Sequence, residues 1–188
     1  MADGTLKVGQ ITTSSGSGTI TLGQSGETIT IPTGATATGF PDNTPMFLAV
    51  PSSNQAVDST TNTLITFGTE VVDTDNAFAS NKFTVPTGKG GKYFLYSSVR
   101  VNDMGDADEV QLSFKKNGGY NFPVGGVDYY SVSNSVQGAA GSIYFTHSLI
   151  AVLAAGDYIE NAVYHNYGSS RNINYTYTRF GGYRIIGA

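Results

Sequence analysis

Threonine alternates with aliphatic residues in two short segments near the start of the chain, 19–22 and 28–31. A period of two is typical of a half-buried strand, and the Gly/Ser-rich residues between the segments favour a turn. The two segments therefore predict a hairpin. Its apolar face would consist of Ile20, Leu22, Ile29 and Ile31. Because a two-stranded hairpin is at best marginally stable in water by itself, this face needs a further surface to cover it.

From about Pro41 onward the alternation recurs in segments that contain more aromatic residues. The longest of these are 90–102, 109–118 and 141–153. The Leu and Ala residues near position 150 could suggest a helix, but the Gly156-Asp157 turn signal that follows favours the end of a long strand. We expect about eight to ten strands, no helix and a turn every ~8–14 residues.

This pattern predicts an all-β fold, a sandwich or jelly roll. The change in composition divides the chain into an N-terminal β arm over residues 1–40 and a head over residues 41–188. A chain of 188 residues is long enough for one head of ordinary size with its own core.

The composition excludes several classes of partner. Charged residues make up 13% of the chain, the net charge is −4, and the ten basic residues are scattered along the chain. We therefore expect no binding to nucleic acid or to an anionic membrane surface. Without cysteine there is no disulfide framework. The first residues do not resemble a signal peptide, and no segment has the ~20 apolar residues of a membrane span, so we expect synthesis in the cytoplasm without Sec-type export.

Five motifs of the head occur in a characteristic order. They are LITFGTEVVDTDNAF (64–78), FTVPTGKGGKYFLYSSVRV (83–101), VQLSFKKNG (110–118), LIAVLAAGDYIENAVYH (149–165) and FGGYRII (180–186). Over about residues 46–187 the chain thereby resembles the globular head shared by the complement C1q family and the tumour necrosis factor superfamily. The resemblance implies a jelly-roll sandwich that assembles as a homotrimer.

The resemblance also implies framework roles for individual residues. The framework aromatic residues would be Phe67, Phe78, Phe83, Tyr93, Phe94 and Phe180. Gly156 and Asp157 would form a turn, and Gly182 and Tyr183 of the last strand would contact the core. A trimer would bring three copies of the hairpin to one axis, where their apolar faces cover one another. A disordered arm is the alternative for the N-terminal segment.

The segment ADGTLKVGQITTSSGSGTITLGQSGETITIPTGAT resembles the Gly/Thr-rich N-terminal stretches of structural proteins from tailed phages of marine bacteria. Joined to such a head, it implies a virion protein: a tail fibre or spike whose arm binds other virion proteins and whose trimeric head contacts a glycan or protein on the host surface. A capsid decoration or head fibre protein is the first alternative, and a non-viral secreted C1q-like module is the second. In both virion roles the protein would be exposed on the tail or capsid.

No arrangement of side chains is typical of an enzyme, and we expect neither catalysis nor a cofactor. The two histidines, His147 and His165, lie in apolar or Tyr-rich segments, where a structural role is favoured. One acidic cluster could supply oxygen ligands to Ca²⁺, but its spacing does not fit a helix–loop–helix calcium loop, and a solvated loop is favoured. Its residues are Asp103, Asp106, Asp108 and Glu109. A glycan hydrolase would need two carboxylates about 5–9.5 Å apart, and no other dense acidic group exists.

Tyrosine is concentrated among Asn, Ser and Gly in two segments, 120–134 and 164–178. Such residues supply rigid amphipathic surface and adaptable hydrogen bonds, as in antibody paratopes, and suit sugar rings. The candidate ligand-binding residues are Tyr120, Tyr129, Tyr130, Tyr167 and Tyr175. The alternative is that these tyrosines line the trimer interface. We expect the first segment at the end of the head away from the arm, with Tyr129 and Tyr130 in a host-binding surface.

Overall fold

The computed structural model describes residues 11, 18–22, 24–35, 43–120, 123–124, 127–128, 131–135 and 141–186. The chain divides into two units, Met1–Phe40 and Pro41–Ala188. The second unit is the head. In the ranges that the structure describes, no helix is long and apolar enough to cross a membrane.

The described residues of the first unit form turns at 25–26 and 33–34 but no strand. The amide of Glu27 donates to the carbonyl of Gln24 at 3.0 Å, and the amide of Gln24 donates to the Glu27 carboxylate at 2.6 Å. The strand pairing expected on either side of this turn is not formed in the single chain. The four side chains of the expected apolar face are between 41% and 62% exposed. The physical reason is that four side chains bury too little surface to hold a lone hairpin together.

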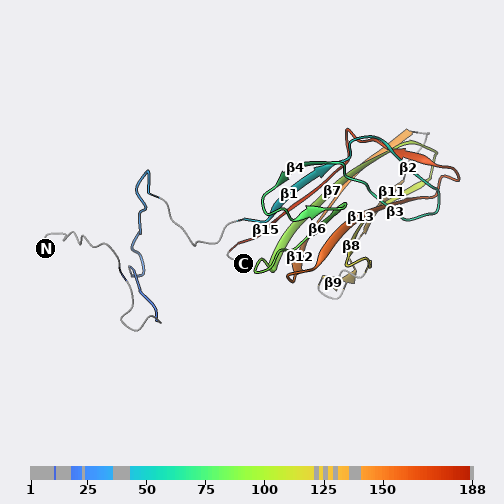
Figure 1. Cartoon of the computed structure of the whole chain (residues 1–188). Helices are drawn as coiled ribbons and strands as arrows, with labels where there is room; N and C mark the ends of the chain where they lie inside the picture. The colour runs from blue at the N-terminus through green and yellow to red at the C-terminus, as the bar shows by residue number, and fades with distance from the viewer. Residues whose placement is uncertain are drawn as a thin grey trace. The chain divides into compact units, whose positions relative to one another are not determined.

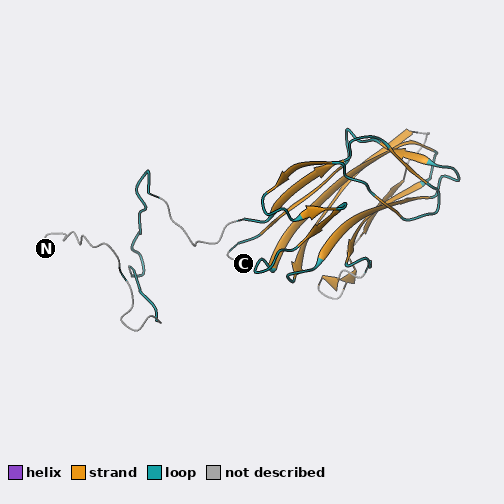
Figure 2. Ribbon diagram, in the orientation of Figure 1, coloured by secondary structure: helices purple, strands orange, loops and turns teal. Residues whose placement is uncertain are grey.

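The head consists of two antiparallel sheets packed against each other, and its described residues contain no helix (Figures 1 and 2). The first sheet has the order β2-β14-β7-β15-β1-β4. Both β14 and β15 pair with one edge of the long strand β7, and β12 pairs with its other edge. Its strands are β1 (Met46–Val50), β2 (Gln55–Val57), β4 (Thr69–Asp73), β7 (Gly91–Met104), β12 (Gly141–Leu153), β14 (Arg171–Ile173) and β15 (Arg179–Arg184).

The second sheet has the order β11-β8-β13-β6-β5, and β3 also pairs with β13. Its strands are β3 (Thr63–Leu64), β5 (Phe78–Ala79), β6 (Lys82–Thr84), β8 (Glu109–Lys116), β11 (Ser131–Ser135) and β13 (Tyr158–His165). The strands β9 (Pro123–Val124) and β10 (Val127–Asp128) form a separate two-stranded pair. The chain crosses repeatedly between the two sheets, as a jelly roll does, and the all-β prediction is confirmed.

The core between the sheets is dominated by phenylalanine rings. Phe47 of β1 stacks on Phe83 of β6 with ring centroids 4.4 Å apart, and meets the edge of Phe180 of β15 at 4.8 Å. Since the Phe47–Phe83 pair joins the two sheets, it helps to hold the sandwich closed. Five of the six residues that the sequence motifs place in the framework are buried here: Phe67, Phe78, Phe83, Tyr93 and Phe180.

Two framework residues lie elsewhere. Phe94 is half-buried, and Tyr183 is 37% exposed; both side chains point away from the core, on the outer face of the first sheet. The reason is the alternation along β7 and β15, in which Tyr93, Leu95 and Phe180 already occupy the inward positions. The core contact expected of Tyr183 is therefore corrected, whereas Gly182 is buried against Phe47 and Leu95.

The turn at Gly156 and Asp157 is held by the Asp157 carboxylate. It receives hydrogen bonds from the Ala154 amide and the Asn117 side chain, each at 2.8 Å, and pairs with the Lys116 ammonium at 2.8 Å. Burial by itself would raise the pKa of Asp157, but these donors outweigh it, and the pKa lies below its usual value. Gly156 adopts a φ of +88°, which favours glycine at the turn.

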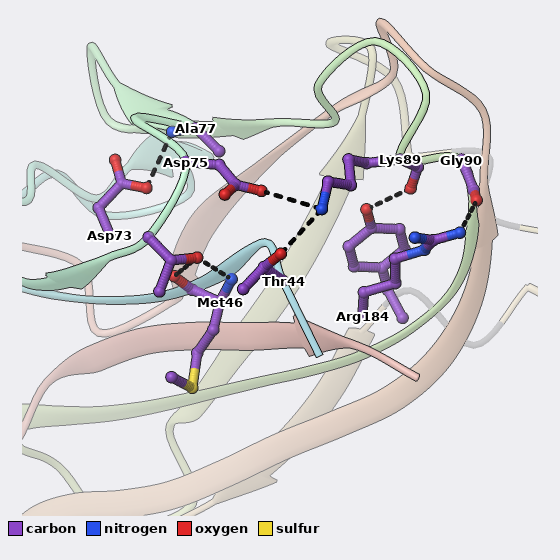
Figure 3. Close-up of polar contacts among 10 residues, drawn as sticks. Thr44, Met46, Asp73, Asp75, Ala77, Lys89, Gly90 and Arg184 are labelled. Atoms are coloured by element: carbon purple, nitrogen blue, oxygen red, sulfur yellow. Dashed lines mark hydrogen bonds and ion pairs between the residues drawn. The ribbon is translucent and has the colours of Figure 1, made fainter. Parts of the chain in front are cut away.

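Polar contacts tie together the end of the head at which β1 begins (Figure 3). The Lys89 ammonium donates to the Thr44 hydroxyl at 2.9 Å, and the Tyr93 hydroxyl donates to the Lys89 carbonyl at 2.6 Å. Arg184 of β15 donates to the carbonyl of Gly90 at 3.1 Å. Burial raises the pKa of Tyr93 to about 12, with Arg184 lowering it and Asp75 raising it by smaller amounts. The loop before β7 is thereby fixed to the segment that leads into β1 and to β15.

Candidate binding face

The outer face of the first sheet is the candidate functional site. Directly opposed residues of antiparallel strands point to the same face, so the register defines rows of neighbouring side chains across the sheet. The first row, which we call the apolar row, consists of Met46, Tyr183, Phe94 and Ile150. Val152 lies beside it on β12, opposite Lys92.

The apolar row is open to solvent. Met46 is 41% exposed, Ile150 is 53% exposed and the neighbouring Val152 is 73% exposed. The rings of Phe94 and Tyr183 pack together at 5.6 Å between centroids. A contiguous group of exposed aliphatic and aromatic side chains is unusual on an isolated domain and marks an interaction surface.

The second row consists of Leu48, Gly181, Tyr96 and Ser148. The Tyr96 ring lies across the position where Gly181 has no side chain, and it stacks on Phe94 at 6.2 Å between centroids. Burial raises the pKa of Tyr96, and the nearby Arg179 lowers it by a smaller amount. The tyrosine hydroxyl therefore stays protonated at neutral pH and can act as donor or acceptor.

The last two rows, which we call the arginine rows, have a different chemistry. One consists of Arg179, Ser98 and Thr146, and the other of Arg100 and Tyr144. A pocket of about 370 Å³ is lined by Arg179, Tyr96, Tyr144, the hydroxyl residues Ser98, Thr146 and Ser148, and by Phe94, Ser97 and His147. A second pocket of about 430 Å³ is lined by Arg100, Ser142, Tyr144 and Tyr177. Tyr144 borders both pockets.

Tyr177 completes the arginine rows from the loop before β15. Its ring meets the ring of Tyr144 edge to face at 5.9 Å, and the Arg100 guanidinium lies 4.8 Å from its centroid. Arg100 also donates to the Ser142 hydroxyl at 3.3 Å. The sequence pattern did not single out Arg100, Arg179 and Tyr144, because they come from three separate strands. Only the alternation along β7 and β12 hinted at their shared face.

The tyrosines predicted to bind a ligand are not brought together. Tyr120 follows β8 at the end of the head where β1 begins, with the Lys115 ammonium 5.1 Å from its ring. Tyr167 lies at the opposite end, and one face of its ring is covered by the Arg171 guanidinium at 3.2 Å. Tyr175 is 49% exposed, and its amide donates to Asn54. Tyr129 and Tyr130 lie outside the described residues.

The predicted position at the far end is wrong for Tyr120, whereas Ser133 of the same segment does lie toward that end. Tyr120 lies at the end where the head begins rather than at the far end, because β8 runs from Glu109 at the far end to Lys116 at the near end. The far end carries a polar pocket of about 390 Å³. Its lining residues are Ala107, Glu109, Ser133, Ser135 and Asn166.

The acidic residues between β7 and β8 form a tight connection. The Asp108 carboxylate accepts from the Gly105 amide at 2.9 Å, and the Asp103 carbonyl accepts from Arg171 at 2.7 Å. Asp106 is exposed, and Glu109 begins β8. Within the described ranges, no three His, Cys, Asp or Glu side chains come together as a metal ion would require.

Both histidines lie in strands and contact the core. His165 is fully buried; its Nε2 lies 2.9 Å from the Val57 carbonyl, and its Nδ1 accepts from the Tyr167 amide at 3.3 Å. This pattern assigns the proton to Nε2 and leaves no ring nitrogen for other chemistry. The His147 ring packs on Phe114 at 4.9 Å between centroids.

Comparisons with known proteins give likenesses in structure alone. No family model matches the chain. No curated protein matches its sequence. Among solved structures, the globular domain of zebrafish complement 1qA protein is similar with a TM-score of 0.49 and 17% identity, over 75% of this chain and 97% of that one. Murine APRIL, a TNF-family protein, is similar with a TM-score of 0.49 and 17% identity, over 74% of this chain and 98% of that one.

Proposed function

We propose that the chain is a non-enzymatic binding module whose heads associate as a homotrimer through the apolar row. The observation that carries this proposal is the exposure of Met46, Ile150 and Val152 beside the paired rings of Phe94 and Tyr183. Each large aliphatic side chain removed from water contributes about 1.5–3 kcal/mol, so covering this row in every copy is strongly favourable.

The edge of the sheet gives a second reason for association. β12 is thirteen residues long and, among the described strands, pairs only with β7. A long edge with unpaired backbone groups and exposed aliphatic side chains invites pairing or covering by another chain. When the same two surfaces join in every copy and the rotation closes, a ring results. The C1q-like sequence motifs favour a ring of three.

Self-association can be tested on two variants that place new carboxylates on opposite sheets of the head. Ile150→Asp/Val152→Asp places carboxylates in the apolar row, and Leu64→Asp places one at a 42% exposed position of the second sheet. Light scattering should give three times the chain mass of 19.7 kDa for the wild type and for the Leu64 variant, and one chain mass for the double variant. A wild-type monomer at micromolar concentration would refute the proposal, and a dimer would refute the trimer.

We further propose that the trimer is a virion protein, a tail fibre or spike that contacts the host surface. Its support is the likeness of the N-terminal segment to phage structural proteins, together with the exposed Ile and Leu residues of that unit, which need a partner. A capsid decoration protein and a non-viral secreted module remain the alternatives. Mass spectrometry of purified virions, with copy number, separates a few fibres from hundreds of decorations, and absence from every virion supports the non-viral alternative.

A further inference from the structure

We propose that the arginine rows form a binding site for an acidic saccharide, with Arg100 and Arg179 recognising its carboxylate or sulfate groups. The inference rests on the proposed function only in taking the head to be a binding module. The site lies within one copy of the chain, so it does not depend on the trimer. The proposal therefore assigns two roles to the outer face of the first sheet: the apolar row serves self-association, and the arginine rows bind an acidic saccharide.

The charge of these rows is the first argument. Arg179 and Arg100 are diagonal neighbours across β15 and β7, since Arg179 lies opposite Ser98 and Arg100 follows two positions later on β7. Within the described part of the chain, neither arginine has a carboxylate partner. Two unneutralised guanidinium groups on one face of a chain with a net charge of −4 form a site of local positive potential.

The other two arginines of the chain, Arg171 and Arg184, have structural roles, because their guanidinium groups donate hydrogen bonds within the head. Arg171 donates to the Asp103 carbonyl, the Ser170 carbonyl and the Ser169 hydroxyl. Arg184 donates to the Gly90 carbonyl. In contrast, the Arg179 side chain donates to no described group, and Arg100 makes one long hydrogen bond, 3.3 Å, to Ser142. Most of their donors therefore remain available for a ligand.

The surroundings of the two arginines suit a sugar. Tyr144 and Tyr177 present two rings at an interplanar angle of 70°, and both are more than 40% exposed. Such rings pack against the apolar face of a pyranose, while the hydroxyls of Thr146 and Ser142 lie in the adjoining pockets for its hydroxyl groups. The guanidinium fork pairs with carboxylate or sulfate in bidentate geometry. Charge, rings and hydroxyls together point to an acidic rather than a neutral saccharide.

The experiment compares two double variants of the full chain that remove the same charge. Arg100→Gln/Arg179→Gln alters the proposed site. Lys82→Gln/Lys115→Gln is the control on the second sheet, where Glu160 lies between the two lysines in the register. The probes are oligogalacturonate, dextran sulfate and neutral dextran, titrated calorimetrically at low ionic strength, with inorganic sulfate as a competitor. Light scattering of each variant reports association separately.

We expect oligogalacturonate or dextran sulfate to bind the wild type, and the arginine variant to bind about tenfold or more weakly. The control variant should stay within about twofold of the wild type, because it leaves the proposed site intact and changes only the weak non-specific attraction that follows net charge. If the arginine variant misfolds, Arg179→Gln alone serves, since that side chain makes no hydrogen bond in the described part of the chain. The site would be refuted if both double variants lost binding equally, or if neither acidic probe bound the wild type. It would also be refuted if neutral dextran bound as well as the acidic probes, or if inorganic sulfate at matched charge competed fully. A trimer without saccharide binding would refute this inference and leave self-association standing.

Discussion

The Tyr96 ring occupies the space above Gly181, so that a Cβ added to Gly181 would lie 2.6 Å from the ring carbon Cζ. This contact sits at the centre of the outer face, between the apolar row and the arginine rows. It joins β7 to β15, because Tyr96 and Gly181 are directly opposed in the register. The absence of a side chain at Gly181 thus lets Tyr96 lie down on the sheet and pack against Phe94.

The first prediction follows from that contact. Gly181→Ala should force the Tyr96 ring away from the sheet, at a cost of about 1–3 kcal/mol for an overpacked contact, and should weaken association by disturbing Phe94. Urea unfolding and light scattering measure the two effects. Gly141→Ala is the matched control, because no atom lies within 4 Å of a Cβ placed there. Equal effects of the two substitutions would contradict the packing role of Gly181.

The second prediction concerns the Asp157 turn. Asp157→Asn removes the negative charge that pairs with Lys116 and replaces one of the two acceptor oxygens with an NH₂ group, and should destabilise the head by about 1–3 kcal/mol at neutral pH. The folded pKa of Asp157 lies below its unfolded value, so its contribution is present above about pH 4 and is lost as the pH falls through the folded pKa. The difference in unfolding free energy between wild type and variant should therefore shrink in acid. A constant difference from pH 7 down to pH 3 would argue against ionised Asp157 as the cause.

The sequence predicted the fold well and the site poorly, for one physical reason. Strand pattern and turn residues are local, so the all-β class, the buried Phe83 and Phe180, and the Gly156-Asp157 turn could be recognised along the chain. The outer face could not, because β7 is aromatic or aliphatic at successive positions on both faces, from Tyr93 to Tyr96. Which of these point inward depends on the partner strands.

The arginine rows were still harder to foresee. Arg100 and Arg179 read as single basic residues in the sequence, and only the pairing of β15 with β7 makes them neighbours. Tyrosine-rich composition, by contrast, suggested a common site for residues that the fold separates. Tyr120 and Tyr167 lie at opposite ends of the head, and each lies beside a different basic side chain, Lys115 and Arg171 respectively.

The third prediction tests the boundary between the two units. Deletion of residues 1–40 should leave a head that folds and associates with little change in melting temperature. The segment contains no aromatic residue before Phe40, and its described apolar side chains are exposed, so the head core gains little from it. Circular dichroism and light scattering of the shortened chain provide the measurement. A head that no longer folds would show that the arm belongs to its core, and the domain boundary would then be wrong.

The last prediction separates the two candidate ligand surfaces. Tyr129→Ala/Tyr130→Ala should leave the mass of the assembly and its melting temperature nearly unchanged while reducing adsorption of heads to host cells, if these tyrosines supply part of the host-binding surface. The Arg100→Gln/Arg179→Gln variant, measured beside it, reports the arginine rows. Loss of adsorption in only one of the two variants assigns binding to that surface, and loss in both indicates that both surfaces contribute. If the tyrosine variant instead dissociates or melts much earlier, Tyr129 and Tyr130 belong to the subunit interface, because removing large rings from an interface core costs association rather than ligand affinity.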